Sequence, residues 1–587
     1  MRFAPLSLAP PDARYTPHPA GGGVLTTAQP LAPHADHLLI LLERWAAEAP
    51  DRVFLAERPA PGQPGWRTVT FAEAHRQALR LAGGLRALGA TAERPLMILS
   101  GNSLTQGLLI LGAMAVGIPA APISPAYSLL SRDHAKLKDV AAQLTPGAIY
   151  VEDGAPFARA LAALGLDVPV IARQNPPPGA HTPEALRQAE PLLADLGPDT
   201  IAKILFTSGS TGRPKGVINT QRMLCANQQA IAQLWPFLGE RPPVLVDWLP
   251  WSHTFGGNHN FNMMLHNGGT LYIDAGKPAP GAFAETVRNL GEVPSTLHFN
   301  VPRGYGLLLD ALEQDADLRR VFFQDLDVIF YAGAALPQNL WARLEALAIQ
   351  ARGQRIHMLS AWGSTETAPM ATAVHFPIER AGVIGLPAPG TEIRMIPVDD
   401  RLELRVRGPN VTPGYWRSPA LTARAFDGEG FFKMGDAARF ADPEDPSKGI
   451  VFAGRTAENF KLQSGTWVLV SALRLDLIAA CAPWIQDCVI AGHDRNAVGI
   501  LIFPSTDAIA DPAAARAGLR ATLEAFNREN PMNSRRVARA LLLEEPPDID
   551  AGEITDKGYL NQRAILQRRA AQVARLYSDD GAVLALA

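Results

Sequence analysis

Ten residues from Thr207 to Gly216, with the sequence TSGSTGRPKG, combine hydroxyl groups, glycines and positive charge in a way that suits phosphate binding. Glycines allow positive φ angles, so successive backbone N–H groups can point into one concavity. The serine and threonine hydroxyls add hydrogen-bond donors, and Lys215 adds mobile positive charge. The natural guest of such a loop is a polyphosphate. A surface turn is the alternative, because stretches rich in glycine, serine and threonine often form turns.

The stretch is not a Walker A phosphate loop. That motif has the pattern GxxxxGK[ST], and the position that needs its second glycine, counted from Gly209, holds Pro214. The apolar run AKILF precedes the loop and predicts a buried strand that leads into it. The loop alone leaves its ligand open, so the elements around it must be considered.

Helical and strand patterns alternate from about residue 36 to about residue 440. Apolar residues recur at helical spacing in HADHLLILLERWAAEAP and TFAEAHRQALRLAGGLRALG. Short apolar runs predict strands in PLMILS, GAIYV, VPVIA, IAKILFTS, PVLVDWLP, GTLYID, STLHFNV, DVIFYAGA and RIHMLSAWGS. The alternation predicts α/β layers with parallel strands, and such sheets bind ligands where strand ends lead into loops.

Both ends of the chain differ from this central pattern. The first 35 or so residues predict a loosely packed arm, and strands become shorter near LRVRGPNVTPGYW. The last 120 or so residues predict a compact α+β module, with strands in DCVIAGH and AVGILIFPS, a helix from AAARAGLRATLEAF and a basic tail helix in NQRAILQRRAAQVARLY. We therefore expect an arm at 1–35, a large N-terminal domain at 36–454, a hinge at 455–459 and a small C-terminal domain at 460–587.

Composition narrows the class of protein. The 587 residues include 54 Lys+Arg and 57 Asp+Glu, a net charge of -3 that gives no reason to expect nucleic acid or an anionic membrane as a partner. The N-terminus lacks the apolar region of a signal peptide, and the longest apolar stretch, GLLILGAMAVGIPAAP, fits a buried helix followed by a strand. The cysteines Cys225, Cys481 and Cys488 form no CxxC pair and predict reduced core thiols. We expect a soluble, cytoplasmic protein.

Six segments that recur in a fixed order resemble the motifs of the adenylate-forming superfamily, which includes acyl-CoA synthetases, carrier-protein adenylation domains and luciferases. They are TSGSTGRPKG, LPWSHTFGG (249–257), YAGAALP (331–337), WGSTETA (362–368), GFFKMGDAARF (430–440) and GRTAENFK (454–461). Within the superfamily, the chain is most similar to bacterial feruloyl-CoA synthetases through APISPAYSLLSRDHAKLK (121–138), FKLQSGTWV (460–468) and DAGEITDKGYLNQR (550–563). The resemblance implies a large N-terminal α/β domain of layered sheets and helices, and a small C-terminal domain that is mobile.

The resemblance implies a two-step reaction with ATP, Mg²⁺ and coenzyme A. A carboxylate and ATP give an acyl-adenylate and pyrophosphate, and the thiol of coenzyme A then gives a thioester. Because the first step brings two anions together, cations and aligned N–H groups are needed around the transferring phosphate. The acid implied is aromatic, of the feruloyl or hydroxycinnamoyl type.

Site residues follow from the matched motifs. The β- and γ-phosphates would be held by Thr207, Ser208, Gly209, Ser210, Thr211, Gly212 and Lys215. Glu366 would bind Mg²⁺, and Thr365 would hydrogen-bond the α-phosphate. The nucleotide would also contact Gly333, Ala334, Trp362, Gly363, Ser364, Asp436 and Arg455, of which Asp436 would accept hydrogen bonds from the ribose. Glu366 as an exposed carboxylate at a helix start, and Trp362 as a core residue, are the structural alternatives.

The remaining roles concern the acyl group and the small domain. His253 would line the acyl site, and Lys557 would neutralise charge during adenylation, although it lies in TDKG, where the family usually has glycine before the lysine. Gly465 would let the pantetheine arm pass, and Lys461 would contact phosphate or be solvated. The hinge has Ala457 where many relatives have aspartate. The acyl pocket would draw on Phe255, Phe299, Tyr305, Tyr331 and Trp362.

Two other functions stay open from the sequence. The acyl group could be transferred to a separate carrier protein rather than to coenzyme A. The chain could also be a catalytically silent binding homologue, which the presence of Lys215, Glu366, Asp436, Arg455 and Lys557 argues against.

Overall fold

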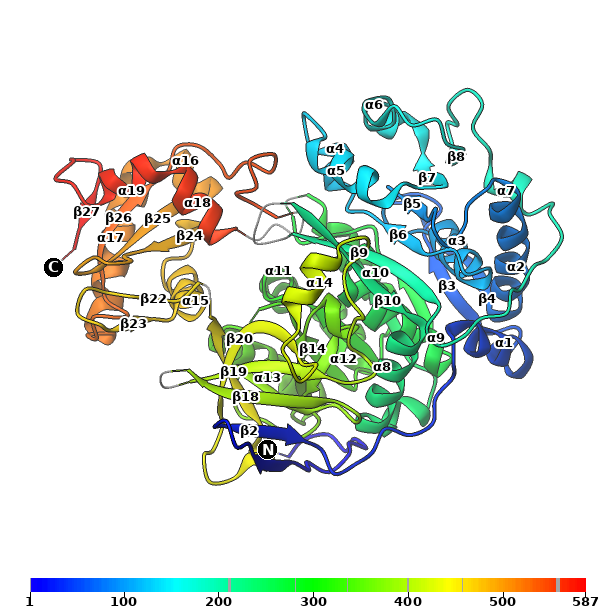
Figure 1. Ribbon diagram of the computed structural model, residues 1–587. Helices are drawn as coiled ribbons and strands as arrows, with labels where there is room; N and C mark the ends of the chain where they lie inside the picture. Colours follow the sequence, from blue (N-terminus) through cyan, green and yellow to red (C-terminus); the bar gives the residue numbers. More distant parts are fainter. Residues whose placement is uncertain are drawn as a thin grey trace. The chain divides into compact units, whose positions relative to one another are not determined.

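The computed structural model describes residues 2–208, 213–279, 281–334, 336–398, 401–456, 458–555 and 560–586, with only the backbone described for Ser208 and Asp507. The contacts within the chain define two compact units (Figure 1). Unit 1 comprises Met1–Pro397, Leu404–Met434 and Phe440–Val451, and unit 2 comprises Val398–Glu403, Gly435–Arg439 and Phe452–Ala587.

One sheet of unit 1 has six strands and carries the predicted phosphate loop. Its order is β10 (Pro214–Thr220), β9 (Ile201–Ser208), β6 (Ala120–Pro122), β5 (Leu96–Ile98), β7 (Ala148–Asp153) and β8 (Val170–Gln174). All neighbouring pairs are parallel except β9 and β10, which are antiparallel. The strand β10 was not predicted, because its first residues, Pro214–Gly216, lie inside the motif that we interpreted as loop.

A second sheet has fifteen strands. Its order is β1 (Arg14–Pro17), β2 (Gly23–Thr26), β18 (Glu392–Val398), β19 (Arg401–Arg407), β20 (Phe432–Phe440), β21 (Ile450–Arg455), β17 (Val383–Pro387), β16 (Met370–Ala373), β15 (His357–Gly363), β14 (Val328–Tyr331), β13 (Leu297–Asn300), β11 (Val244–Asp247), β12 (Thr270–Ile273), β3 (Val53–Glu57) and β4 (Arg67–Thr70). The run from β15 through β14, β13, β11 and β12 to β3 is parallel, as the alternation of helices and strands predicts. Strands β18 to β21 each carry residues of both units.

Helices connect and cover these strands. They are α1 (Leu38–Glu48), α2 (Phe71–Ala87), α3 (Leu104–Ala115), α4 (Ala126–Leu129), α5 (Ala135–Leu144), α6 (Gly154–Leu164), α7 (Pro183–Leu186), α8 (Gln221–Leu234), α9 (Phe261–Asn267), α10 (Phe283–Glu292), α11 (Pro302–Gln314), α12 (Ala316–Gln324), α13 (Gln338–Arg352) and α14 (Pro419–Ala425), with shorter turns η1 (Pro236–Gly239), η2 (Phe255–Asn260), η3 (Thr365–Thr367) and η4 (Pro446–Lys448). Every residue of α3 is buried, which confirms the predicted buried helix before β6.

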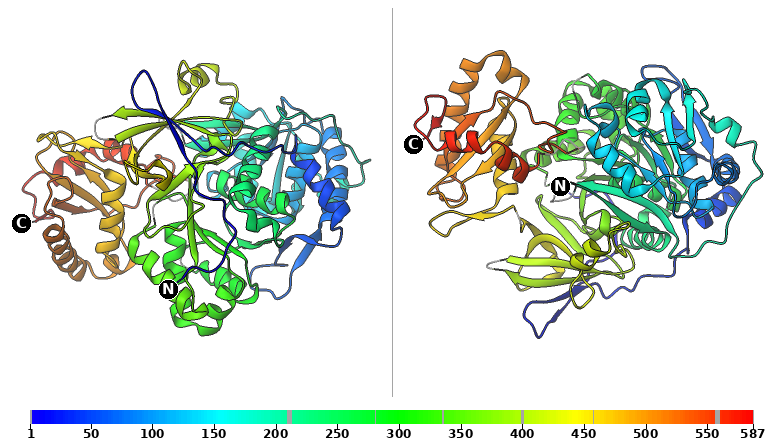
Figure 2. Two further views of the ribbon diagram at one scale, coloured as in Figure 1. Left: turned by 90° about the horizontal axis from the view of Figure 1, so that it is seen from below. Right: turned by 45° about the horizontal axis from the view of Figure 1, so that its top comes forward.

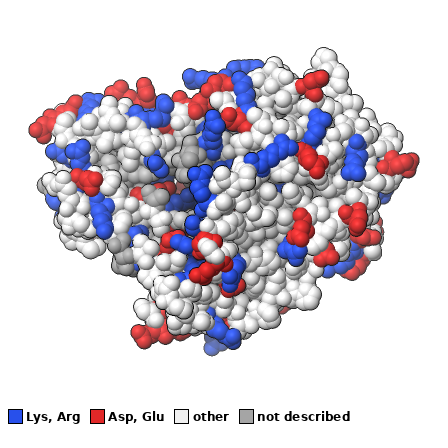
Figure 3. Space-filling view, in the orientation of Figure 1, with Lys and Arg blue, Asp and Glu red and all other residues white. Residues whose placement is uncertain are grey.

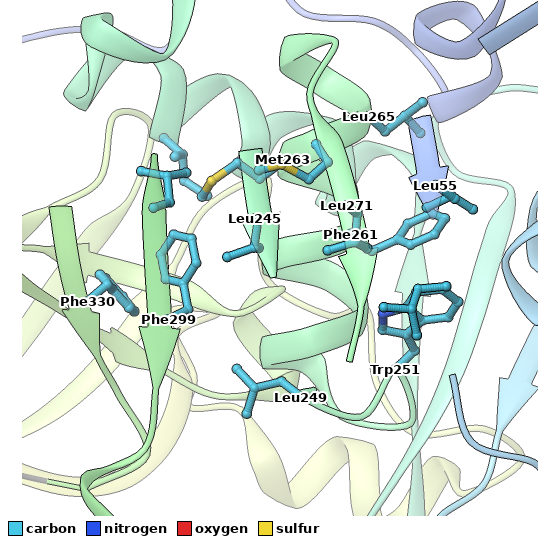
Figure 4. Packing of buried hydrophobic residues seen from close by; sticks show 14 of the residues in the cluster. Leu55, Leu245, Leu249, Trp251, Phe261, Met263, Leu265, Leu271, Phe299 and Phe330 are labelled. Carbon is cyan, nitrogen blue, oxygen red and sulfur yellow. The ribbon is translucent and has the colours of Figure 1, made fainter. Parts of the chain in front are cut away.

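The core of unit 1 holds α9 against the parallel strands. Figure 4 shows Leu271 of β12, Leu245 of β11 and Phe299 of β13 beside Phe261 and Met263 of α9. All five side chains are at most 2% exposed. Because η2 ends where α9 begins, this packing also fixes the position of η2.

The N-terminal arm is packed rather than loose. Strand β2 pairs antiparallel with β18, and Leu25 on β2 is fully buried. The backbone N–H of Ala9 donates to the carbonyl oxygen of Leu234, and Figure 2 shows the segment (dark blue) running across unit 1. The loose packing predicted for this segment is therefore wrong, because β2 pairs with a strand of the sheet and buries an apolar side chain.

Unit 2 builds a small α+β module. Its sheet has the order β24 (Ile485–Ala491), β25 (Val498–Pro504), β26 (Val537–Leu542) and β27 (Leu584–Ala585), and β22 (Phe460–Lys461) pairs with β23 (Trp467–Val468). One face of the sheet packs on α15 (Val470–Ala480) and α17 (Pro512–Glu529), and the other on α18 (Gln562–Arg568) and α19 (Ala570–Leu576); the short helix α16 (Thr506–Ala510) precedes α17. Alternation along β24 and β25 supplies both faces with apolar side chains.

The predicted basic tail helix is two helices, α18 and α19, which meet at Arg569. The guanidinium of Arg569 is buried, pairs with Glu553 at 2.7 Å and also donates to the carbonyl oxygens of Glu545 and Pro546. This tertiary anchoring accounts for the break, since a buried arginine must satisfy its donors.

Four further observations concern the protein as a whole. All three cysteines are buried and free, as predicted. No helix among the described residues is both long enough and apolar enough to cross a membrane. Figure 3 shows basic and acidic side chains interspersed over the visible face, in keeping with the small net charge. The architecture confirms the predicted α/β class, with a large sheet-rich domain and a small C-terminal one.

Candidate active site

The predicted phosphate loop joins β9 and β10. The residues Gly209, Ser210, Thr211 and Gly212 lie outside the described part of the chain, as does the side chain of Ser208. The strands on either side are described, and Thr207 lies directly opposite Lys215 in their register. Lys215 is partly buried. The hairpin therefore fixes the residues on either side of the loop and places Thr207 and Lys215, both predicted to bind phosphate, side by side.

A segment around Tyr415 runs antiparallel along β10. The N–H of Ile218 donates to the carbonyl oxygen of Gly414 at 3.1 Å, and the N–H of Trp416 donates to that of Gly216 at 2.7 Å. Tyr415 is thus opposite Val217. Tyr415 shares a face with Val217, because the two residues lie opposite each other. Lys215 is two residues from Val217 on β10, so its side chain lies on that same face. The Nζ atom of Lys215 is 5.4 Å from the centre of the Tyr415 ring.

Glu366 reaches the same tyrosine from another element. It lies in the short turn η3, where its N–H donates to the Oγ of Ser364 and its carbonyl oxygen accepts a 2.8 Å hydrogen bond from the N–H of Thr412. The Oη of Tyr415 donates to Oε1 of Glu366 at 3.0 Å. The structure thus brings together Lys215 and Glu366, which are far apart in sequence, through one tyrosine that we did not predict.

Tyr415 remains a hydrogen-bond donor because of its surroundings. It is 6% exposed, and burial, followed by the nearby Glu366 carboxylate, raises the pKa of its hydroxyl well above the ordinary value. The preceding Gly414 has φ +147°, and a Cβ there would lie 2.4 Å from Cγ2 of Thr422. Only glycine fits this close approach, which turns the chain into the tyrosine. The sequence PGY contained this information, since glycine before a buried aromatic residue indicates a constrained turn.

His253 lies in a turn just before η2, a π-helical segment. Its backbone N–H donates to the carbonyl oxygen of Pro250, and its own carbonyl oxygen accepts from the N–H of Gly257. A Cβ at Gly257 would lie 2.4 Å from the carbonyl oxygen of Trp251, and one at Gly256 would lie 2.3 Å from that of Leu249. The two glycines of the motif therefore allow the tight turn that holds His253. Single π-helical turns are frequent at functional sites.

A buried lysine, Lys203 of β9, supports this turn. Its Nζ donates to the carbonyl oxygen of Gly257 at 2.6 Å and to Oδ1 of Asn258 at 3.3 Å. Asn258 in turn donates to Asn219 of β10 at 2.6 Å. Lys203 is 1% exposed, and burial lowers its pKa to about 7. We did not predict Lys203 as a site residue, although a lysine inside the apolar run IAKILF is an unusual choice that could have drawn attention.

Two of the predicted acyl-pocket aromatics, Phe255 and Phe299, pack against each other and against Phe330, which was not predicted. Phe255 lies 6.3 Å from Phe299 and 5.8 Å from Phe330, and Phe299 lies 5.1 Å from Phe330, measured between ring centres. The hydroxyl of Tyr305 donates to the carbonyl oxygen of Phe330 at 2.6 Å. Phe255 is the most exposed of the three phenylalanines, and Phe299, Tyr305 and Tyr331 are buried. Trp362 on β15 is also buried, at 7% exposure.

The other predicted nucleotide contacts of unit 1 cluster at the ends of β14 and β15. Gly333 is exposed and has φ +84°, Ala334 follows it, and the side chain of Thr365 is buried. Gly363 ends β15, and a Cβ there would lie 1.8 Å from the carbonyl oxygen of Pro369. Strands β14 and β15 are parallel neighbours, so their carboxyl ends bring these segments to one edge of the sheet.

Unit 2 holds the remaining predicted residues. Asp436 on β20 is 8% exposed, and its Oδ1 lies 3.7 Å from Nε of the more exposed Arg455. Gly465 has φ +79° in the turn between β22 and β23, and Nζ of Lys461 lies 4.9 Å from the ring centre of Trp467. Lys557 and the hinge residue Ala457 lie outside the described residues.

The donor set of the site fits a metal ion that arrives with a nucleotide. Among the described residues, no group of three or more histidine, cysteine or acidic side chains could hold a metal by itself. Glu366 offers one half-buried carboxylate. Mg²⁺ in nucleotide sites is usually bound by one or two carboxylates together with phosphates and water, so a single carboxylate suffices.

Two family models match the chain. The model of the AMP-binding enzyme matches residues 42–416, and the model of the AMP-binding enzyme C-terminal domain matches residues 470–581. The first covers more than half of the chain and includes the phosphate-loop, His253, Glu366 and Tyr415 segments. The chain therefore belongs to the AMP-binding enzyme family, that is, to the adenylate-forming superfamily.

The chain matches only part of the length of its curated relatives. A carboxylic acid reductase of Segniliparus rugosus is 26% identical over 430 residues, which are 67% of this chain and 34% of that protein. A probable CoA ligase of Humulus lupulus, CCL8, is 26% identical over 338 residues, which are 54% of this chain and 53% of that protein. The matched part of the chain thus spans between a third and about half of their lengths.

Solved structures share the fold. The anthranilate CoA ligase AuaEII in complex with anthranoyl-AMP has a TM-score of 0.74 at 19% identity, covering 93% of this chain and 99% of that one. The A domain of the Segniliparus rugosus carboxylic acid reductase, in complex with AMP and a co-purified carboxylic acid, has a TM-score of 0.72 at 20% identity, covering 92% and 94%.

Proposed function

We propose that the chain is an ATP-dependent acid–thiol ligase that activates an aromatic carboxylic acid as its adenylate and transfers the acyl group to coenzyme A. In the first step, a carboxylate oxygen bonds to the α-phosphorus of ATP, and pyrophosphate leaves. In the second, the thiol sulfur bonds to the acyl carbon, AMP leaves and the thiol proton is released. The observation that carries the proposal is the convergence of Lys215 and Glu366 on Tyr415 within a chain of this family.

The residue roles form part of the proposal. Lys215 and the loop Thr207–Gly212 hold the β- and γ-phosphates, Thr365 donates to the α-phosphate, and Glu366 is the protein ligand of Mg²⁺. When bound, Mg²⁺ neutralises charge on phosphate oxygens. Asp436 accepts hydrogen bonds from the ribose, and Arg455 reaches the ribose or a phosphate. Trp362 stacks near the base, Gly333 and Ala334 leave room for the base or the acyl group, and the nucleotide also contacts Gly363 and Ser364.

In this proposal, residues of the small domain act in both steps. Lys557 neutralises the carboxylate and the α-phosphate during adenylation, and Gly465 allows the thiol-bearing arm of coenzyme A to pass close to the backbone. His253 lines the acyl site. The proposal divides the chain into an arm at 1–35, a large domain at 36–454, a hinge at 455–459 and a small domain at 460–587.

A flat phenolic acid of the feruloyl or hydroxycinnamoyl type is the proposed substrate. The aromatic group of Phe255, Phe299 and Phe330 beside the His253 turn supports an aromatic guest, because edge-to-face ring contacts favour aromatic partners. The similarity in fold to a ligase whose name states anthranilate, another aromatic acid, is consistent with this class.

Transfer to a carrier protein is a second candidate, because carboxylic acid reductases and a probable non-canonical nonribosomal peptide synthetase are among the relatives. A solved structure of similar fold is the didomain of adenylation and carrier domains of such a reductase. In that case the thiol belongs to a carrier-bound arm, and the first half-reaction is unchanged.

One assay separates these functions. The purified chain is supplied with ATP, Mg²⁺ and ferulate or other acids, and pyrophosphate release is followed before and after coenzyme A is added. Pyrophosphate with a hydroxycinnamoyl thioester supports the ligase, pyrophosphate without thioester supports the carrier, and no pyrophosphate with any acid contradicts adenylation. Lys557→Ala should slow adenylation far more than thioester formation from a supplied adenylate, whereas equal loss in both would contradict its role.

A further inference from the structure

We propose that Tyr415 is a positioning residue that orients the Glu366 carboxylate for the nucleotide-bound metal ion. This inference rests on the proposed function, since it assumes that Glu366 binds the metal. It assigns a role to a residue outside the motif that contains Glu366, and it makes the segment that runs along β10 part of the metal site.

The hydroxyl that makes this hydrogen bond belongs to a buried side chain. The Oη of Tyr415 lies 3.0 Å from Oε1 of Glu366, and Tyr415 is 6% exposed. A hydroxyl that donates to one carboxylate oxygen restricts rotation of the carboxylate while its other oxygen stays available. Hydrogen bonds to metal-binding carboxylates commonly orient them, and loss of such a partner typically weakens metal affinity about 10- to 100-fold.

The backbone around both residues is fixed independently of any ligand. Thr412 donates its N–H to the carbonyl oxygen of Glu366, and its Oγ1 donates to the carbonyl oxygen of Ile218 on β10 at 2.7 Å. Asn410 donates to the carbonyl oxygen of Thr367 at 3.1 Å. The segment that carries Tyr415 is therefore joined both to η3 and to β10, so the hydroxyl and the carboxylate meet in a preformed arrangement.

Tyr415 also links the metal ligand to the phosphate-binding cation. Lys215 lies over the Tyr415 ring, 5.4 Å from its centre, whereas Glu366 contacts the hydroxyl. These two contacts use different parts of one side chain. Replacement by phenylalanine removes only the hydroxyl, so it separates an effect on the metal from an effect on the phosphates.

The experiment compares nucleotide affinity with and without metal. Calorimetric titration with α,β-methylene ATP, which cannot be cleaved at the reacting bond, is carried out in Mg²⁺ and in EDTA. We expect the wild-type chain to bind the analogue more tightly in Mg²⁺. In Tyr415→Phe, this metal-dependent gain should fall about 10-fold or more, while affinity in EDTA stays the same.

A matched control removes a hydrogen bond of the same kind elsewhere. Tyr150 on β7 is fully buried, and its hydroxyl donates to Glu152. Tyr150→Phe should retain the metal-dependent gain. In addition, Tyr415→Phe should cause no further loss when combined with Glu366→Gln, because the tyrosine acts through that carboxylate.

The outcomes are distinct. An unchanged gain in Tyr415→Phe, or an equal loss in Tyr150→Phe, overturns the role of Tyr415 while the proposed function stands. A wild-type chain whose affinity does not depend on Mg²⁺, and which releases no pyrophosphate, overturns the proposed function and the role of Tyr415 with it. Melting temperatures of all variants, measured by circular dichroism, show whether each is folded.

Discussion

The two lysines of the β9–β10 hairpin, Lys203 and Lys215, differ in their burial and in the groups that they contact. Lys215 is partly buried and lies over the ring of Tyr415, beside the predicted phosphate loop. Lys203 is fully buried and donates to the backbone and side chain of the π-helical segment η2. In the proposed function Lys215 meets the phosphates, whereas Lys203 holds a neighbouring segment of the fold. The proposal thus gives one short hairpin a binding residue and a supporting residue.

The largest effect is expected from Lys215→Ala. Loss of a cation that stabilises phosphate charge should lower the rate of acid-dependent ATP–pyrophosphate exchange by about 10²-fold or more. The melting temperature should hardly change, because the side chain is not part of the core. The exposed Lys277 of the same unit gives the matched control Lys277→Ala, which should keep full exchange. Equal rates for both variants would mean that Lys215 does not meet the phosphates.

Lys203 should instead affect stability, in a pH-dependent way. Its pKa is lowered to about 7 in the folded chain, against an ordinary value of 10.5. Between these values the unfolded chain holds a proton that the folded chain lacks, so rising pH favours the folded state. At pH 7 and below, this contribution is a penalty that lowers stability.

The test compares wild type with Lys203→Met, which has no titrating group. Between pH 7 and 9, the free energy of unfolding of the wild type should rise relative to that of the variant by up to about 1.4 kcal/mol per pH unit. Denaturation curves at several pH values, followed by intrinsic fluorescence, measure this difference. A difference that stays constant with pH would show that Lys203 keeps its proton in the folded chain.

The contrast between the two lysines also explains what the sequence could predict. Lys215, Glu366 and the glycines of the motifs could be proposed as site residues because they lie in segments that resemble the motifs of the superfamily. The parallel strands were predicted because helical and strand patterns alternate along this part of the chain. Tyr415 and Lys203 were missed because their roles come from tertiary neighbours, Glu366 and Gly257, that are distant in sequence. The tail-helix break at Arg569 was missed for the same reason, since its partner is Glu553.

The smallest expected effect concerns the segment that Lys203 supports. In Gly257→Ala, the new Cβ would lie 2.4 Å from the carbonyl oxygen of Trp251, so the backbone before η2 must shift. We expect a loss of about 1–3 kcal/mol in the free energy of unfolding and a raised KM for the acid, because His253 moves with the turn. Gly239→Ala is the matched control, since nothing lies within 4 Å of a Cβ at that position. If Gly257→Ala changes stability but leaves the KM for every acid tested as in the wild type, the turn supports the fold alone and His253 has no part in the acyl site.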